Sequence, residues 1–199
     1  MFNIGITGGI GTGKTTVCKI FEILGIPVFY ADQAAKQVMH EDELLVEEIK
    51  SAFGASAYSR AGELDRKYLA GIVFNDEFQL ERLNSLVHPA VFRAYDKWKG
   101  DQKASYVIKE AALLFESGSY KESDYNVVVT SPLELRIKRI MKRDGISVEQ
   151  VKARMSKQMS EEEKVKLADF IVKNDESELL IPQVLDLHQT FLQLSKQSQ

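Results

Sequence analysis

Gly8-Gly9-Ile10-Gly11-Thr12-Gly13-Lys14-Thr15 fits the pattern G-x-x-x-x-G-K-[ST] of a phosphate-binding P-loop, and the predicted architecture is built around it. Before it, Phe2, Ile4 and Ile6 alternate with other residues as in a short strand. After it, an apolar series at helical spacing runs until Gly25. The motif therefore lies between a predicted strand and a predicted helix, which is the context that a P-loop requires.

The residue types of this stretch suit a nucleoside triphosphate and its Mg²⁺ ion. Glycines let the backbone N–H groups turn inward at a helix N-terminus and form a nest for anions. Lys14 can reach the β- and γ-phosphates as a point charge, and the Thr15 hydroxyl can ligate Mg²⁺. The alternative is a glycine-rich turn with an exposed lysine. We predict an ATP site made of Gly9, Ile10, Gly11, Thr12, Gly13, Lys14, Thr15 and Thr16.

The composition of the 199 residues is that of a soluble globular protein. Hydrophobic residues make up 44% and charged residues 28%, and the net charge of −3 gives no field that recruits nucleic acid. No apolar run approaches about 18 residues, so we expect no membrane partner. The N-terminus enters a strand at once, without the features of a signal peptide. The single cysteine, Cys18, fits a reducing compartment, so we expect a cytoplasmic protein with Cys18 as a packed side chain rather than a nucleophile.

Several short apolar runs are typical of buried strands in a parallel sheet. They are residues 2–7, 27–30, 106–109, 125–130 and 170–172. Helical patterns separate them, so the sequence predicts an α/β P-loop NTPase fold with a doubly wound, five-stranded parallel sheet. Residues 33–100 contain no good strand and are predicted to be a helical insertion. A second insertion covers residues 132–167, which leaves residues 1–32, 101–131 and 168–199 as the nucleotide-binding core.

The second insertion is basic. Three capping boxes are predicted to start its helices, at Ser131 with Pro132 at the first helical position, at Ser147 and at Ser160. Five of the eight residues from Arg136 to Arg143 are basic and none is acidic. Such a run is either a solvated helix face or a kinase lid whose arginines stabilise the transferring phosphoryl group. The P-loop favours a lid over residues 132–167, with Arg139 and Arg143 as the catalytic arginines and Arg154 behind them.

Three further residues are candidates for the site. Asp32 follows the second predicted strand, at a carboxyl end where open α/β sheets place their sites, and it is either a helix N-cap or the carboxylate that faces an attacking hydroxyl. Glu110 follows the third strand, and it is either a surface glutamate or the acid that P-loop enzymes keep near Mg²⁺. His88 is followed by Pro89, and it either closes a helix or serves the site.

Several separated motifs resemble those of the dephospho-CoA kinase family, in an order and spacing that cover nearly the whole chain. They are the P-loop at residues 6–16, Tyr30-Ala31-Asp32 for D-A-D, Gly62-Glu63-Leu64-Asp65-Arg66, His88-Pro89, Leu113-Leu114-Phe115-Glu116 for the L-L-F-E of P-L-L-F-E, and Arg154 with Gln158, Ala168-Asp169 and Asn174. The chain departs from the family at Tyr30, which replaces the first aspartate of D-A-D, and at Ala112, which replaces the proline of P-L-L-F-E.

The resemblance implies a reaction in which ATP phosphorylates the ribose 3′-hydroxyl of dephospho-CoA, giving CoA and ADP in the last step of CoA biosynthesis. It implies that Asp32 is the catalytic carboxylate, that residues 33–100 hold the acceptor and that Asn174 belongs to the adenine-binding loop. The implied substrate-binding residues are Asp32, Arg66, His88, Glu110 and Arg154. The expected ligands are dephospho-CoA, ATP and Mg²⁺, with no nucleic acid, and the expected assembly is a monomer or a weak homo-oligomer.

Other functions remain open from the residues alone. A kinase for another nucleoside, nucleotide or small hydroxyl compound would use the same P-loop, lid and carboxylate, and the helical insertion would decide between them. An adenylate-kinase type of P-loop usually has proline where Ile10 stands. A GTP-binding switch would need an N-K-x-D element, which the sequence lacks. The presence of Lys14, Thr15 and Asp32 argues against a nucleotide-binding protein that has lost catalysis.

Overall fold

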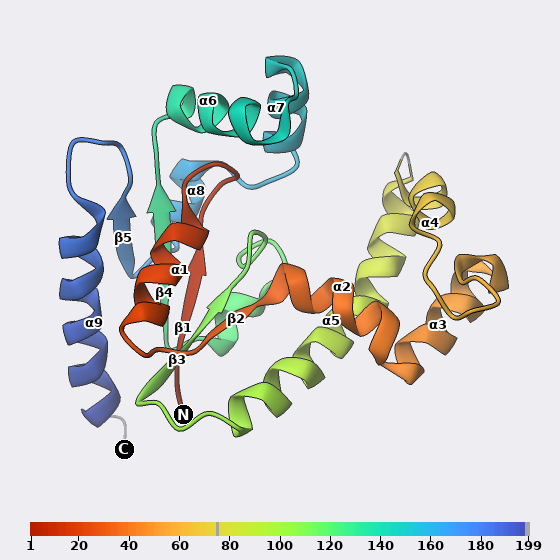
Figure 1. Cartoon of the computed structure of the whole chain (residues 1–199), viewed down its shortest axis with the longest axis horizontal. Helices are drawn as coiled ribbons and strands as arrows, with labels where there is room; N and C mark the ends of the chain where they lie inside the picture. The colour runs from red at the N-terminus through yellow and green to blue at the C-terminus, as the bar shows by residue number, and fades with distance from the viewer. Residues whose placement is uncertain (75, 198–199) are drawn as a thin grey trace. The chain divides into compact units, whose positions relative to one another are not determined.

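The computed structural model describes residues 1–74 and 76–197 (Figure 1). The chain divides into two compact units. The first joins residues 1–30 to the chain from residue 102 onward, and the second is residues 31–101. Among the described residues, no helix is long and apolar enough to span a membrane.

A five-stranded parallel sheet forms the centre of the first unit, as predicted. Its strands are β1 (Phe2–Thr7), β2 (Val28–Tyr30), β3 (Tyr106–Glu110), β4 (Tyr125–Thr130) and β5 (Phe170–Lys173), in the order β2-β3-β1-β4-β5. β1 is the central strand and is fully buried along its length. The P-loop therefore starts at the middle of the sheet edge formed by the carboxyl ends of the strands, where open α/β sheets place their ligands.

Helices α1 (Lys14–Ile23) and α9 (Leu180–Gln197) lie side by side and pack on the core of this unit (Figure 1). The rings of Phe21 and Phe191 stack with centroids 6.3 Å apart, and both are fully buried. Pro182 lies in the first turn of α9, where a missing N–H costs no helical hydrogen bond. Cys18 of α1 is also fully buried, so the prediction of a packed side chain is confirmed. Burial, and then the charge of Glu110, raise the pKa of its thiol above the ordinary value.

The second unit is helical, as predicted for residues 33–100. It contains α2 (Ala31–Glu41), α3 (Glu43–Phe53), the short 3₁₀ helix η1 (Ala55–Ala57), α4 (Arg66–Val73) and α5 (Glu77–Gly100). Helix α5 runs through Pro89, so the interpretation of His88-Pro89 as a helix end is wrong. A proline inside a helix costs about 3 kcal/mol. Buried side chains on both sides of it, including Val87 and Val91, offset this cost because α5 packs against α2, α3 and α4.

The second insertion contains α6 (Leu133–Asp144), α7 (Val148–Met155) and α8 (Glu161–Lys166), and the 3₁₀ helix η2 (Ser119–Glu122) precedes β4. The capping boxes at Ser147 and Ser160 are confirmed, with both reciprocal hydrogen bonds present in each. The capping box at Ser131 is wrong. Pro132 is the N-cap of α6 and Ser131 makes no capping bond, because its hydroxyl accepts a hydrogen bond from Arg139 at 2.9 Å.

Candidate active site

The P-loop leads from β1 into the first turn of α1, and its own contacts shape it. The buried Thr12 hydroxyl donates to the Gly9 carbonyl at 2.9 Å, which closes the turn. The Lys14 ammonium donates to the Gly8 carbonyl at 2.9 Å, so this side chain curls back over the loop. Thr15 and Thr16 are exposed in the first turn of the helix. The Lys14 ammonium, the hydroxyls of Thr15 and Thr16 and the N-terminus of α1 thus belong to the segment that binds phosphate groups in P-loop proteins.

Gly13 is a position that only glycine fits. Its φ of 97° lies in the left-handed region, and an added Cβ would overlap the side-chain amide of Asn174. That amide donates to the Thr12 carbonyl at 2.7 Å, so Asn174 holds the loop from the end of β5.

Gly13→Ala is therefore expected to weaken ATP binding about tenfold or more, because a side chain in this conformation adds about 1–2 kcal/mol of strain and displaces Asn174. Calorimetric titration with ATP measures the effect. Gly71→Ala is the matched control, since an added Cβ there meets no atom within 4 Å. Equal ATP affinity of Gly13→Ala and the unchanged protein would contradict the role assigned to this glycine.

Two residues of the second insertion hold Ile10 of the P-loop. The Arg136 guanidinium donates to the Ile10 carbonyl at 3.0 Å, and the Ile10 N–H donates to the Gln158 side chain at 2.9 Å. Arg136 is only 9% exposed and also pairs with Glu161 at 3.4 Å. Burial lowers the pKa of Arg136, and the charges of Glu161 and Glu162 oppose this effect. The residues predicted as a lid therefore contact the phosphate-binding loop directly.

The sequence analysis did not select Arg136, although a signal for it exists. It lies three residues after Leu133 and four before Ile140, so it borders the apolar stripe of α6. An arginine at the edge of a buried stripe is a candidate for an internal contact. A count of charges alone does not distinguish which of the five basic residues of this helix makes such a contact.

Glu116 of the Leu113–Glu116 motif anchors the chain next to Gln158. Its carboxylate accepts from the Met159 N–H at 2.9 Å and pairs with Lys164 at 2.8 Å. Lys164 is fully buried and also donates to the Ala112 carbonyl at 3.1 Å. The pair fixes the passage from α7 to α8, and with it the residue that binds the Ile10 N–H.

Arg139 lies beside Asn174. The sequence analysis assigns both residues to the nucleotide site, and such an assignment requires them to be close together. Its guanidinium donates to the Asn174 carbonyl at 3.2 Å and to the Ser131 hydroxyl at 2.9 Å. Arg143 and Arg154 lie differently, because each pairs with Asp144 at 2.7 Å. Hydrogen bonds from Arg143 hold the pKa of Asp144 below its usual range. In this structure these two arginines connect the end of α6 to α7.

Glu110 is the last residue of β3 and is 6% exposed, so the interpretation as a surface glutamate is wrong. In the sheet it pairs with Ile6 of β1 and Tyr30 of β2. Tyr30, which replaces the family aspartate, has a raised pKa, mainly through burial and further through Cys18, Glu22 and Glu110. A neutral phenol therefore stands at the end of β2 where the family has a carboxylate.

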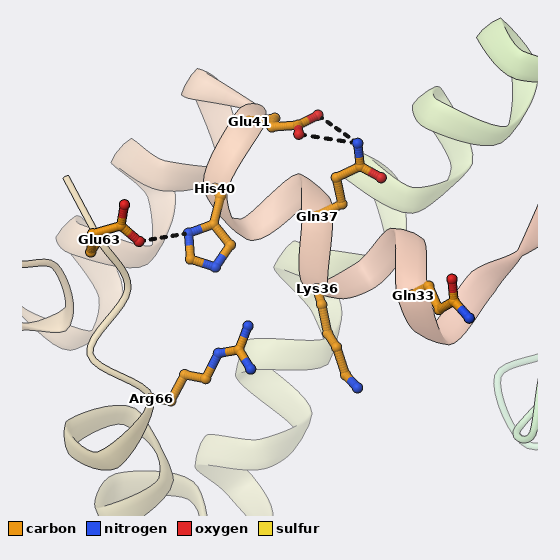
Figure 2. A pocket seen from close by; sticks show the side chains of 7 residues that line it. All are labelled: Gln33, Lys36, Gln37, His40, Glu41, Glu63 and Arg66. Atoms are coloured by element: carbon orange, nitrogen blue, oxygen red, sulfur yellow. Dashed lines mark hydrogen bonds and ion pairs between the residues drawn. The ribbon is translucent and has the colours of Figure 1, made fainter.

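Three predicted site residues belong to the second unit. Asp32 is exposed in the first turn of α2, which begins at Ala31, so the N-cap interpretation is wrong. Arg66 begins α4 and lines a groove together with residues of α2 (Figure 2). His88 is half-buried inside α5.

Oxygen ligands suitable for Mg²⁺ are present in the first unit. The Thr15 hydroxyl is exposed at the start of α1, and the Glu110 carboxylate stands at the carboxyl end of β3. Mg²⁺ in nucleotide sites is commonly held by one or two protein oxygens together with phosphate oxygens and water. Within the described part of the chain, no group of three or more His, Cys, Asp or Glu side chains is arranged to hold a metal ion by itself.

Comparison with known proteins gives consistent results. The family model for dephospho-CoA kinase matches residues 2–179. A dephospho-CoA kinase of Salinibacter ruber is 45% identical over 178 residues, which cover 88% of this chain and 89% of that protein. One of Bacteroides fragilis is 38% identical over 185 residues, covering 92% and 90% respectively.

Solved structures give the same result for the fold. A crystal structure from Thermus thermophilus has a TM-score of 0.84 and 37% identity, covering 95% of this chain and 96% of its own. The dephospho-CoA kinase of Campylobacter jejuni has a TM-score of 0.68 and 33% identity, covering 99% and 98%. A shikimate kinase of Bacteroides thetaiotaomicron, at 14% identity and a TM-score of 0.51, shares the fold alone.

Proposed function

Since the chain belongs to the dephospho-CoA kinase family, and so phosphorylates the ribose 3′-hydroxyl of dephospho-CoA with ATP in the last step of CoA biosynthesis, we propose that Lys14, Asp32 and Arg139 carry the transfer. The single observation behind this assignment is the family match over residues 2–179, which includes all three positions. The contacts of Lys14 and Arg139 around the P-loop support it.

The donor half of the reaction belongs to the first unit. The loop N–H groups and Lys14 bind the ATP phosphates, and Asn174 lies beside the adenine. Thr15 and Glu110 would hold Mg²⁺, which neutralises charge on the β- and γ-phosphates when bound. The fully buried β1 and the contact of Asn174 with Thr12 support this arrangement, because they keep the loop in a fixed shape before ATP arrives.

Residues 132–167 act as the lid. Arg139 stabilises the charge of the transferring phosphoryl group, and its bond to the Asn174 carbonyl keeps it at the nucleotide. Arg143 and Arg154 exchange Asp144 for oxygens of the phosphoryl group and of the acceptor, respectively. Closure of the lid excludes water, which limits hydrolysis of ATP.

Residues 33–100 hold the acceptor, with Arg66 and His88 among its contacts. Asp32 faces the 3′-hydroxyl and orients it for attack on the γ-phosphorus. In a loose transition state little bond to the nucleophile has formed, so this orientation matters more than early removal of the proton. The exposed position of Asp32 in the first turn of α2 supports this role, because the carboxylate is open to a ligand.

The cellular setting completes the proposal. The only cysteine is buried and no disulfide is possible within one chain, which supports a cytoplasmic enzyme. We expect a monomer or a weak homo-oligomer, which light scattering after size-exclusion chromatography measures directly.

Mg²⁺-dependent ADP release with a panel of acceptors tests the assignment. We expect turnover with dephospho-CoA and a product phosphorylated at the ribose 3′-position, and none with adenosine, AMP, UMP or pantothenate at the same concentration. Preferential turnover of another member of the panel would overturn the substrate assignment. ADP release that does not change when Mg²⁺ is chelated would overturn the metal assignment.

A further inference from the structure

Two side chains of the second insertion hold both polar groups of the Ile10 backbone. The Arg136 Nε donates to the Ile10 carbonyl at 3.0 Å, and the Ile10 N–H donates to the Gln158 side-chain oxygen at 2.9 Å. Ile10 lies between the end of β1 and the start of α1, so it belongs to no helix or strand that would bond these groups. We call Arg136 and Gln158 the Ile10 clamp, because they join the P-loop to α6 and to the chain between α7 and α8.

Each half of the clamp is itself held in position. The Nη1 atom of Arg136 pairs with Glu161 at 3.4 Å. Gln158 is followed by Met159, whose N–H donates to Glu116 at 2.9 Å, and Glu116 in turn pairs with a fully buried lysine at 2.8 Å. Side chains whose own positions are fixed by further contacts hold a site more precisely than free side chains do.

Helix α6 lies directly against the loop at the two glycines that flank Ile10. An added Cβ at Gly9 would overlap the Arg136 guanidinium, and one at Gly11 would meet the Arg136 carbonyl oxygen at 2.9 Å. Arg136 is also buried. Its charge therefore acts on the loop at short range and with little screening by water.

The hydrogen bond to the Ile10 carbonyl also affects the next N–H of the loop. This carbonyl and the Gly11 N–H belong to one peptide group, so a guanidinium that donates to the oxygen polarises the N–H. A polarised N–H is a stronger donor towards an anion. Arg136 thereby strengthens the Gly11 N–H as a donor without any contact of its own with a ligand.

Lys14 indicates which phosphate this part of the loop faces. A P-loop lysine reaches the β- and γ-phosphates. Here its ammonium donates to the Gly8 carbonyl at 2.9 Å, and Gly8 stands two residues before Ile10. In ATP bound as proposed, the γ-phosphate therefore lies at the stretch from Gly8 to Gly11.

We infer that Arg136 and Gln158 are positioning residues of the transfer, which hold the Gly11 N–H against the γ-phosphate of ATP. This role rests on the proposed binding of the phosphates by Lys14 and the loop. Arg139 follows Arg136 by three residues on α6, so the clamp also keeps the proposed catalytic arginine in register with the loop. ADP has no γ-phosphate, so its binding does not depend on the clamp.

Gln158→Met tests one half of the clamp. Methionine keeps the length of the side chain but removes the oxygen that accepts from the Ile10 N–H. We expect kcat to fall about tenfold and the affinity for ATP to fall severalfold, because a preorganised donor loosens, while the affinity for ADP stays within about twofold. Calorimetric titrations with each nucleotide and steady-state kinetics measure these values. Gln189→Met, which makes the same change at an exposed position of α9, should alter none of them.

A pair of substitutions tests the other half. Arg136→Met removes both the donor and the charge, and we expect kcat to fall about 10²-fold. Arg136→Lys keeps a cation that can donate to the Ile10 carbonyl, so kcat should recover to within about tenfold of the unchanged protein. Because Arg136→Met leaves Glu161 without its partner, thermal unfolding is measured alongside, and Gln158→Met decides the question if Arg136→Met does not fold.

The outcomes separate this role from a structural one and from the proposed function. Equal losses of ATP and ADP affinity in Gln158→Met would show that the residue supports the whole loop, which overturns the inference. A kcat equal to that of Gln189→Met would overturn it as well. A kcat of Arg136→Lys no higher than that of Arg136→Met would contradict the part assigned to the buried charge. If Gln158→Met behaves as expected but Lys14→Ala keeps its kcat/KM for ATP, the clamp stands and the proposed role of Lys14 fails.

Discussion

Replacement of Lys14 by alanine is expected to lower kcat/KM for ATP by about 10³-fold, because a preorganised charge at the transferring phosphate is lost. Lys14 begins α1 and bends back to the Gly8 carbonyl, so its ammonium already stands over the loop that binds phosphate. Positioning and electrostatic stabilisation supply nearly all of the catalysis in phosphoryl transfer. Steady-state kinetics at saturating dephospho-CoA measure the loss.

Lys19→Ala is the control for this prediction. Lys19 is an exposed lysine on the same helix, so the substitution removes the same charge outside the P-loop. It should leave kcat/KM for ATP within about twofold of the unchanged protein. An unchanged kcat/KM in Lys14→Ala would exclude the role of Lys14 at the phosphates, provided that its thermal unfolding midpoint matches that of Lys19→Ala.

Asp32→Asn is expected to reduce kcat by about 10²–10⁴-fold while the affinity for ATP stays within about twofold. The amide keeps the size of the side chain but removes the negative charge that we propose orients the attacking hydroxyl. The residues proposed to bind ATP belong to the first unit, whereas Asp32 belongs to the second, so the two measurements should separate. Single-turnover kinetics with bound ATP measure the transfer step, and calorimetric titration measures the affinity.

The matched control is Asp96→Asn, which removes an exposed carboxylate from the same unit. Asp96 lies in α5 and pairs only weakly with Lys99, at 3.3 Å on the surface. Its substitution should leave kcat unchanged. Equal turnover of Asp32→Asn and Asp96→Asn would show that Asp32 is not the carboxylate at the acceptor hydroxyl.

The sheet could be predicted from the sequence because its burial is visible there. Parallel strands covered on both faces are continuously apolar, as in Val127, Val128 and Val129, which are all fully buried. Helix ends were harder to predict, because tertiary contacts decide them. Ser131 begins a sequence pattern typical of an N-cap, but its hydroxyl accepts a hydrogen bond from Arg139 instead. The pair His88-Pro89 is typical of a helix end, but α5 continues past Pro89 because its packing against neighbouring helices stabilises it.

The candidate site was predictable where it is local in the chain and not where it is assembled from distant segments. The P-loop is a run of eight residues whose conformation follows from its own glycines. The contact between Arg136 and Ile10 joins residues that are 126 positions apart, and nothing near either one in the sequence indicates the other. The same holds for the support that Glu116 gives to Met159.

The burial of Cys18 has a consequence for the chemistry of the ligand itself. Dephospho-CoA and CoA both end in a thiol, so the enzyme works among thiols and, under oxidation, among their disulfides. Thiol–disulfide exchange needs an accessible thiolate, and the only sulfhydryl group of this chain is fully buried and held in its protonated form by its surroundings. The folded enzyme therefore offers no partner for a mixed disulfide with its own substrate or product.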